Sequence, residues 1–134
     1  MLDGADIGGV RMTTSNFNGV SAKGARFAGA RMRAVDFRGA NLAGANFGGA
    51  KGPAANFEGA MMAGVNFRKA GLAGANLVGA DLTDANFLRA DLWKANLQQA
   101  VVTGANFTRA RLRIAKLPDK MDGPNLRRAE MPAG

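Results

Sequence analysis

Cationic side chains recur at a fixed interval along this chain of 134 residues. Lys69, Arg89 and Arg109 are 20 residues apart. A second series, two residues further along, comprises Arg11, Arg31, Lys51, Asp91 and Arg111. Guanidinium and ammonium groups bind carboxylates and phosphates through charge-assisted hydrogen bonds. If the fold stacks residues that are 20 apart, these cations form a strip that either docks an acidic partner or only keeps the surface soluble.

The only tryptophan, Trp93, follows the apolar Leu92 and is expected to point outward on the same cationic half. Arg113 lies 20 residues after it, so a cation–π contact could hold the indole in place. An exposed Trp beside Arg is typical of binding hot spots, although the ring could instead lie flat over its neighbours. The candidate partner-binding residues are therefore Arg11, Arg31, Lys51, Lys69, Arg89, Trp93, Arg109, Arg111 and Arg113.

No group of residues suited to catalysis is evident. The chain has neither His nor Cys, which excludes disulfides, thiolate nucleophiles and Cys or His metal sites. Its few Ser and Thr lack a His to activate them, and Asp81, Asp84 and Asp91 are expected on different faces or corners. We therefore predict no enzyme activity, no cofactor and no metal.

The formal net charge of +8 favours acidic proteins, nucleic acids or anionic membrane surfaces as partners. The first residues, Met1-Leu2-Asp3-Gly4, lack the basic and apolar regions of a signal peptide. No apolar run approaches the roughly 18 residues needed to span a bilayer. These features predict a cytoplasmic location and no transmembrane segment.

A five-residue repeat organises the chain from residue 2 to residue 117. Large apolar side chains occupy 22 of the 24 centre positions (2, 7, 12 and so on), the exceptions being Ala22 and Gly52. Ala stands two residues before the centre in 18 of 23 repeats. A period of five fits neither a helix nor a strand, so short extended pieces must alternate with turns, for which the frequent Gly, Asn and Asp are suited. Repeats this small cannot hold a core alone and must stack.

Three consecutive pentads resemble the A-(D/N)-(L/F)-x-x unit of the pentapeptide-repeat family. They are Ala-Asn-Leu-Val-Gly at 75–79, Ala-Asp-Leu-Thr-Asp at 80–84 and Ala-Asn-Phe-Leu-Arg at 85–89. The resemblance covers residues 1–117. It implies an all-β fold, a right-handed quadrilateral parallel β-helix with four pentapeptides per coil and nearly six coils. It also implies that the centre and the small residue point inward.

The phenylalanines test this four-sided arrangement, because each Phe residue number ends in seven. With 20 residues per coil they fall on two opposite walls, where their rings would stack at about 4.8 Å intervals. One wall comprises Ile7, Phe27, Phe47, Phe67, Phe87 and Phe107; the other comprises Phe17, Phe37, Phe57, Leu77, Leu97 and Leu117. The same wrapping places the excess positive charge on the two faces centred on residues 7, 27, 47 and 12, 32, 52.

Two departures interrupt the pattern. Gly52-Pro53 removes an inward side chain and a backbone donor, which indicates either a kink at a binding site or a tolerated packing defect filled by Met32. After Leu117 the register breaks, and we interpret residues 118–134 as irregular pentads or a cap whose positive and negative charges cancel. The open ends of the solenoid suggest self-association or a segment of a longer protein.

The charge distribution points to the basic side as the surface that binds a protein partner. The family resemblance implies that the chain is an interaction or scaffold module. It also implies attachment to a larger bacterial protein, with a secreted effector as one alternative. Two other functions remain open: a DNA mimic that acts on gyrase and protects it from quinolones, which the positive charge disfavours, and direct binding of nucleic acid by the basic corner. Apart from Trp93, aromatic platforms for bases are nearly absent.

Overall fold

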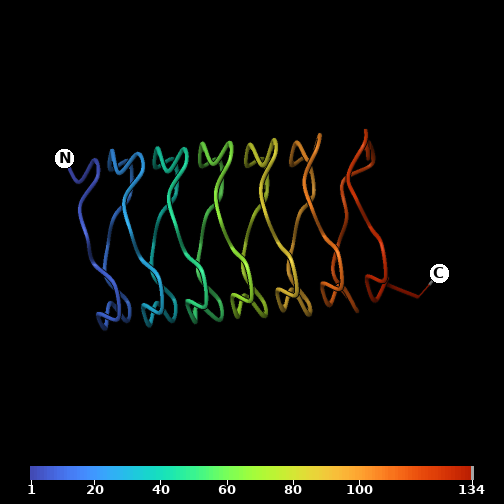
Figure 1. The fold of residues 1–134 in the computed structure, drawn as a ribbon, viewed down its shortest axis with the longest axis horizontal. Helices are drawn as coiled ribbons and strands as arrows, with labels where there is room; N and C mark the ends of the chain where they lie inside the picture. The colour runs from blue at the N-terminus through green and yellow to red at the C-terminus, as the bar shows by residue number, and fades with distance from the viewer. Residues whose placement is uncertain (134) are drawn as a thin grey trace.

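The computed structural model describes residues 1–133 as a rod of stacked coils, with the N- and C-termini at opposite ends (Figure 1). In this part of the chain the regular pairing consists of isolated parallel bridges rather than longer strands or helices. Asp6 bridges Arg26, Arg26 bridges Asn46, and Asn46 bridges Asn66. Since each bridge joins residues 20 apart, one coil takes 20 residues, and the fold is the all-β solenoid that the repeat predicts.

The backbone hydrogen bonds explain why each position of the pentad has its residue type. Around Phe47, the centre N–H donates to Asn66 in the next coil at 2.7 Å and the Asn46 N–H donates to Ala25 in the previous coil at 2.9 Å. The Gly49 N–H donates to the next coil, and the Ala50 N–H closes the turn on Phe47. The remaining donor, Gly48 N–H, is bonded to the Asn46 side chain at 2.8 Å. Asn or Asp before the centre therefore satisfies the one N–H that no backbone group reaches.

The core is a double ladder of phenylalanine rings. Phe27 and its successors on one wall stack at centroid distances between 4.6 and 5.2 Å. On the opposite wall, Phe17, Phe37 and Phe57 stack at 5.3 Å. The two ladders meet edge to face, as between Phe47 and Phe57 at 5.8 Å. The predicted stacking of the Phe columns is confirmed, and the inward alanines between them leave room for the rings.

The Gly52-Pro53 departure produces no break in the solenoid. The Gly52 N–H donates to Gly71 at 2.7 Å, and Pro53 accepts from Ala34 at 3.1 Å. A Cβ built on Gly52 would come within 3.0 Å of the terminal methyl of Met32. Of the two interpretations, the tolerated packing defect filled by Met32 describes the structure.

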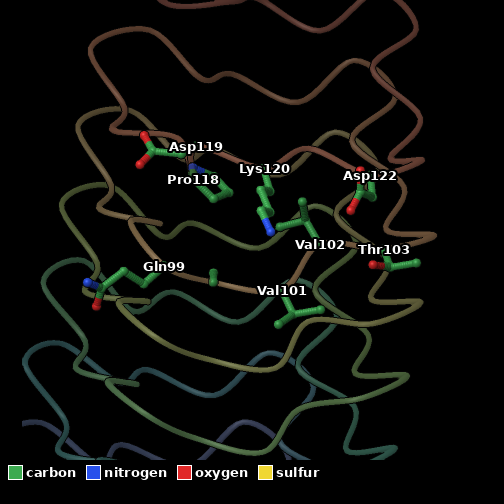
Figure 2. A pocket seen from close by; sticks show the side chains of 9 residues that line it. Gln99, Val101, Val102, Thr103, Pro118, Asp119, Lys120 and Asp122 are labelled. Carbon is green, nitrogen blue, oxygen red and sulfur yellow. The ribbon is translucent and has the colours of Figure 1, made fainter.

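After Leu117 the chain returns to the stack one residue early. Asn106 bridges Asn125 and Arg111 bridges Glu130, so the spacing across this junction is 19 instead of 20. Leu126 therefore takes the centre position and packs against the core. Beneath the loop that follows Leu117, a pocket of about 380 Å³ opens between Val101 and Lys120. Figure 2 shows Lys120 lying across this pocket between Asp119 and Asp122.

Candidate basic groove

The two cation series predicted from the sequence do form columns on the exterior. In the first, the Lys69 N–H donates to Leu88 and the Arg89 N–H to Thr108, so Lys69, Arg89 and Arg109 follow one another along the rod. In the second, successive bridges run through Arg11, Arg31, Lys51, Gly71, Asp91, Arg111 and Glu130. Cations that are 20 residues apart in the sequence therefore lie next to each other along the rod, as predicted.

Three arginines outside the predicted set adjoin the first column, and Arg128 continues it. The Arg109 N–H donates to the Arg127 carbonyl at 2.9 Å, which places Arg127 next to Thr108 and Arg128 next to Arg109. Together with Arg68 they enclose a groove of about 440 Å³. We call it the arginine groove; it is lined by Arg68, Leu88, Arg89, Thr108, Arg109, Arg127 and Arg128.

A second hollow of about 320 Å³ continues the surface toward the middle of the rod. It shares Arg89 with the arginine groove and is also lined by Lys51, Lys69 and Asp91. Gly71 lies between Lys51 and Asp91 in the bridge column and has no side chain to fill this space. Lys51 from the second column and Lys69, Arg89 and Arg109 from the first thus line two hollows that adjoin at Arg89. Arg11 and Arg31 lie further toward the N-terminal end, beyond both hollows.

Not every cation of the strip is free. Arg111 lies between two carboxylates, with Nη1 3.3 Å from Asp91 and Nε 3.7 Å from Glu130. The only other ion pair in residues 1–133 joins Arg38 and Asp36. The arginine groove therefore has no carboxylate within ion-pair distance of its guanidinium groups.

The arginine groove shares its backbone conformation with the other turns of the rod, in which non-glycine residues such as Thr14, Ala34 and Gln99 also adopt a positive φ. Every turn from Gly4 to Ile114 has a positive φ two residues after the centre, a conformation that costs an L side chain free energy and suits glycine. In the groove column this position is Gly in the coils of Gly29 and Gly49, with φ of 68° and 64°. In the following coils the same position is occupied by Lys69, Arg89, Arg109 and Arg128, with φ between 55° and 57°.

Trp93 points outward as expected, with 40% of its surface exposed. Its cation differs from the expected one, since Nζ of Lys94 lies 5.9 Å from the ring centroid. Arg113 contacts this region through its carbonyl oxygen, which accepts the Lys94 N–H at 3.0 Å. Because Lys94 shares the turn with Trp93, a local contact replaces the one predicted between coils. Trp93 and Arg113 do not line the arginine groove.

Other kinds of site receive no support from the described residues. In this range no group of three or more acidic side chains could hold a metal ion, and no side-chain polar atom is buried without a hydrogen bond. The described chain also has no helix with the length and apolarity required to cross a bilayer.

Comparison with known proteins bears on the fold and the family. A family model for pentapeptide repeats matches in 8 copies over residues 23–51, 30–68, 54–87 and 85–118. Among solved structures, HetL from the cyanobacterium Nostoc sp. strain PCC 7120, a pentapeptide repeat protein involved in heterocyst differentiation regulation, is 27% identical with a TM-score of 0.49. The alignment covers 95% of this chain and 66% of HetL, so the chain spans slightly less than two thirds of that protein.

Two further solved structures are similar. QnrB1, a plasmid-mediated fluoroquinolone resistance protein, is 21% identical over 97% of this chain and 84% of its own, with a TM-score of 0.57, a likeness that shows the fold alone. A pentapeptide repeat protein from the Arabidopsis thaliana thylakoid lumen is 32% identical over 76% of this chain and 71% of its own, with a TM-score of 0.49. No curated protein sequence matches the chain.

Proposed function

Since the chain belongs to the pentapeptide-repeat family, we propose that it is a non-enzymatic interaction module that binds an acidic protein partner through its basic side. The docking surface comprises the arginine groove and the adjoining hollow beside Lys51 and Lys69. Trp93 and Arg113 extend it toward the next face. The module works as a rigid support: the coils hold the cations in place while the partner supplies the opposite charge.

The observation that carries this proposal is the absence of internal carboxylate partners for these cations. Within residues 1–133 the ion pairs involve only Arg38 and Arg111. Stacking like charges at about 4.8 Å intervals is unfavourable unless solvent or a partner screens them. A partner with carboxylates aligned along the rod would relieve this repulsion.

The two rival functions fit the surface less well. A DNA mimic needs a rod with negative charge, whereas this chain carries +8, and the likeness to QnrB1 concerns the fold alone. Direct binding of nucleic acid is compatible with the cations. However, Asp91 lies in the adjoining hollow, and the groove has no aromatic side chain on which a base could stack.

The proposal also covers the geometry of the rod and its place in the cell. The rod is a right-handed quadrilateral coil of four pentapeptides with nearly six coils in residues 1–117, which the 20-residue bridges support. It acts in the bacterial cytoplasm, either as part of a longer protein or, in the alternative, as a segment of a secreted effector. Its open ends would allow self-association.

A pull-down tests the proposed function. The chain is immobilised and exposed to a lysate of the organism that encodes it, in three forms: wild type, Arg89→Glu/Arg109→Glu, and the control Arg26→Glu/Arg33→Glu, which changes the charge equally outside the docking surface. We expect a partner that the wild type and the control recover and the groove variant loses. A Trp93→Ala variant reports whether the indole contributes. Identical recovery by all four forms would show that the basic surface keeps the protein soluble and does not bind the partner.

Two assays address the rivals directly. In a gel-shift titration we expect no retardation of duplex or single-stranded DNA at about 50 mM salt, where phosphate contacts are still strong. In gyrase supercoiling with and without ciprofloxacin we expect no change on adding the chain. Retardation that weakens steeply with salt would replace the proposal with nucleic-acid binding, and protection of gyrase would replace it with the topoisomerase function.

A further inference from the structure

We infer that the arginine groove is the docking site for an acidic peptide segment of the partner, in which glutamate or aspartate side chains flank an apolar residue. This inference rests on the proposed function and adds the location and the chemistry of the contact. It also assigns a role to the short junction after Leu117, because Arg127 reaches the groove only through the 19-residue spacing there.

The junction determines which residues face outward. With the regular 20-residue spacing, Arg127 would take the centre position in the coil after Phe107 and point into the core, and Ala129 would follow Arg109. With the observed spacing, Leu126 packs on the core and the Arg127 carbonyl accepts from the Arg109 N–H at 2.9 Å. Arg128 would follow Thr108 with the regular spacing and would still line the groove. The shorter spacing therefore partly buries Leu126, adds Arg127 to the groove and aligns Arg128 with Arg109.

The charge of the groove identifies the chemistry of its ligand. Five of its seven lining residues are arginines, and no carboxylate is among them. Arginine differs from lysine in presenting a planar pair of donors that matches a carboxylate. Since the arginines come from successive coils spaced by about 4.8 Å, they extend over roughly 14 Å from Arg68 to Arg128. An extended peptide of about four residues spans that distance.

The floor of the groove favours a peptide over a nucleic acid. Leu88 and Thr108, both half-buried, lie between the arginines, so an apolar side chain of the ligand would find an apolar contact there. The neighbouring column carries Asp91 and Glu130 beside Arg111. A polyphosphate backbone broader than the groove would meet these carboxylates, whereas a narrow peptide avoids them.

Glycine is the less strained alternative to the cations of the groove column. Lys69, Arg89, Arg109 and Arg128 occupy left-handed turns where the equivalent Gly29 and Gly49 fit without strain, with nothing within 4 Å of an added Cβ. Lysine or arginine at the position just before each of these residues would give the same net charge without that strain. Replacing a cation of this column by glycine therefore removes its charge without adding backbone strain, which makes glycine variants suitable tests of the groove.

Fluorescence anisotropy tests the inference with defined probes. The first probe is a short labelled peptide of glutamates interrupted by leucine, the second has glutamine for every glutamate, and the third is a labelled oligo(dT). We expect wild type to bind the glutamate peptide and not the glutamine peptide, with oligo(dT) weaker than the first. Tighter binding of oligo(dT) would overturn the inference in favour of a nucleic-acid site.

Variants then locate the site. Arg127→Glu/Arg128→Glu should weaken binding of the glutamate peptide by about tenfold or more, the loss expected for charge-assisted contacts. The control Arg26→Glu/Arg33→Glu carries the same charge change outside the groove and should stay within about twofold. Equal losses in both pairs would show attraction to overall charge and overturn the inference.

A second double variant, less disruptive to the fold, excludes misfolding as the cause of lost binding. Arg109→Gly/Arg128→Gly restores the residue that suits these turns, so its thermal midpoint should equal or exceed that of wild type while peptide affinity falls. Unchanged affinity with an intact fold would contradict the inference. If wild type ignores the glutamate peptide but the pull-down still recovers a partner that depends on Arg89 and Arg109, the inference fails and the proposed function stands.

Discussion

The rings of Phe27 and Phe47 lie with their centroids 4.6 Å apart and their planes 4° from parallel. Phe47 also stacks on Phe67 at 5.0 Å and meets Phe37 and Phe57 edge to face at 5.7 and 5.8 Å. One ring thus contacts four others across three coils. The stability of the middle of the rod depends on such shared contacts, since a coil cannot bury its centre residues alone.

Phe47→Ala should therefore be strongly destabilising, by about 3–5 kcal/mol of unfolding free energy, because it removes a fully buried ring and leaves a cavity. Phe47→Leu should cost less than about 2 kcal/mol, since Leu77 occupies the equivalent place on the opposite wall with no exposed surface. Urea unfolding of both variants provides the comparison. Equal losses would mean that the loss of ring stacking, rather than cavity formation, sets the cost.

The left-handed turns allow a test of backbone strain without any packing change. Gly79 has a φ of 66°, and nothing lies within 4 Å of an added Cβ, so Gly79→Ala should cost about 1 kcal/mol from conformation alone. Gln99, with a φ of 64°, offers the reverse experiment, and Gln99→Gly should be neutral or stabilising. Measuring both by urea unfolding separates strain from contacts. A stabilising Gly79→Ala would contradict the assignment.

Much of the solenoid could be predicted from the sequence because its information is local and repeated. The Ala and apolar centre two residues apart indicate the inward face, and the positions of Phe27 and Phe47 agree with the 20-residue coil that the family resemblance implies. Asn46 before its centre is equally informative, because its side chain caps the N–H of Gly48. Each of these relations recurs many times along the chain, so the pattern predicts it repeatedly.

The completed groove could not be predicted in the same way. Residues 118–124 carry no pentad, and tertiary packing decides where the chain rejoins the stack. The phase of Leu126 and Met131, one residue early relative to Leu117, was the signal that placed Arg127 and Arg128 outside. The net charge of residues 118–134 hides this placement, because Arg127 and Arg128 are offset there by acidic residues. The Trp93–Lys94 contact depends on side-chain conformations, which the pentad pattern does not encode.

Gly52 and Met32 should behave as a coupled pair. A Cβ on Gly52 would come within 3.0 Å of the Met32 methyl and 3.3 Å of the Ala55 Cβ. Gly52→Leu alone is therefore expected to overpack the core and cost about 1–3 kcal/mol. Adding Met32→Ala should recover part of this loss, because it frees the space that Met32 now fills. A double-mutant cycle by urea unfolding measures the coupling, and strictly additive effects would show that the two side chains do not share a cavity.

The pH dependence of stability should include a contribution from Asp36. Hydrogen bonds from the Arg38 side chain, and then from its backbone N–H, hold the pKa of Asp36 below its ordinary value of 3.8. Because the folded pKa is depressed, the stabilisation is present above the unfolded pKa and is lost as the pH falls through 3.8 toward the folded pKa.

Asp36→Asn should change stability little at neutral pH, since the pair lies at the surface and Asn can still accept the Arg38 N–H, as Asn56 accepts that of Glu58 at 3.0 Å. Below the ordinary pKa of Asp36, the unfolding free energy of the variant should fall less steeply than that of wild type, measured by urea unfolding across this acid range. Arg38→Gln, which removes the charged guanidinium donors, should raise the pKa of Asp36 toward its ordinary value and flatten the same slope. In the Asp36→Asn background, Arg38→Gln should then have no further effect on the slope. If wild type and Asp36→Asn lose stability in parallel on acidification, the acid sensitivity arises from other carboxylates and the Asp36–Arg38 pair does not contribute.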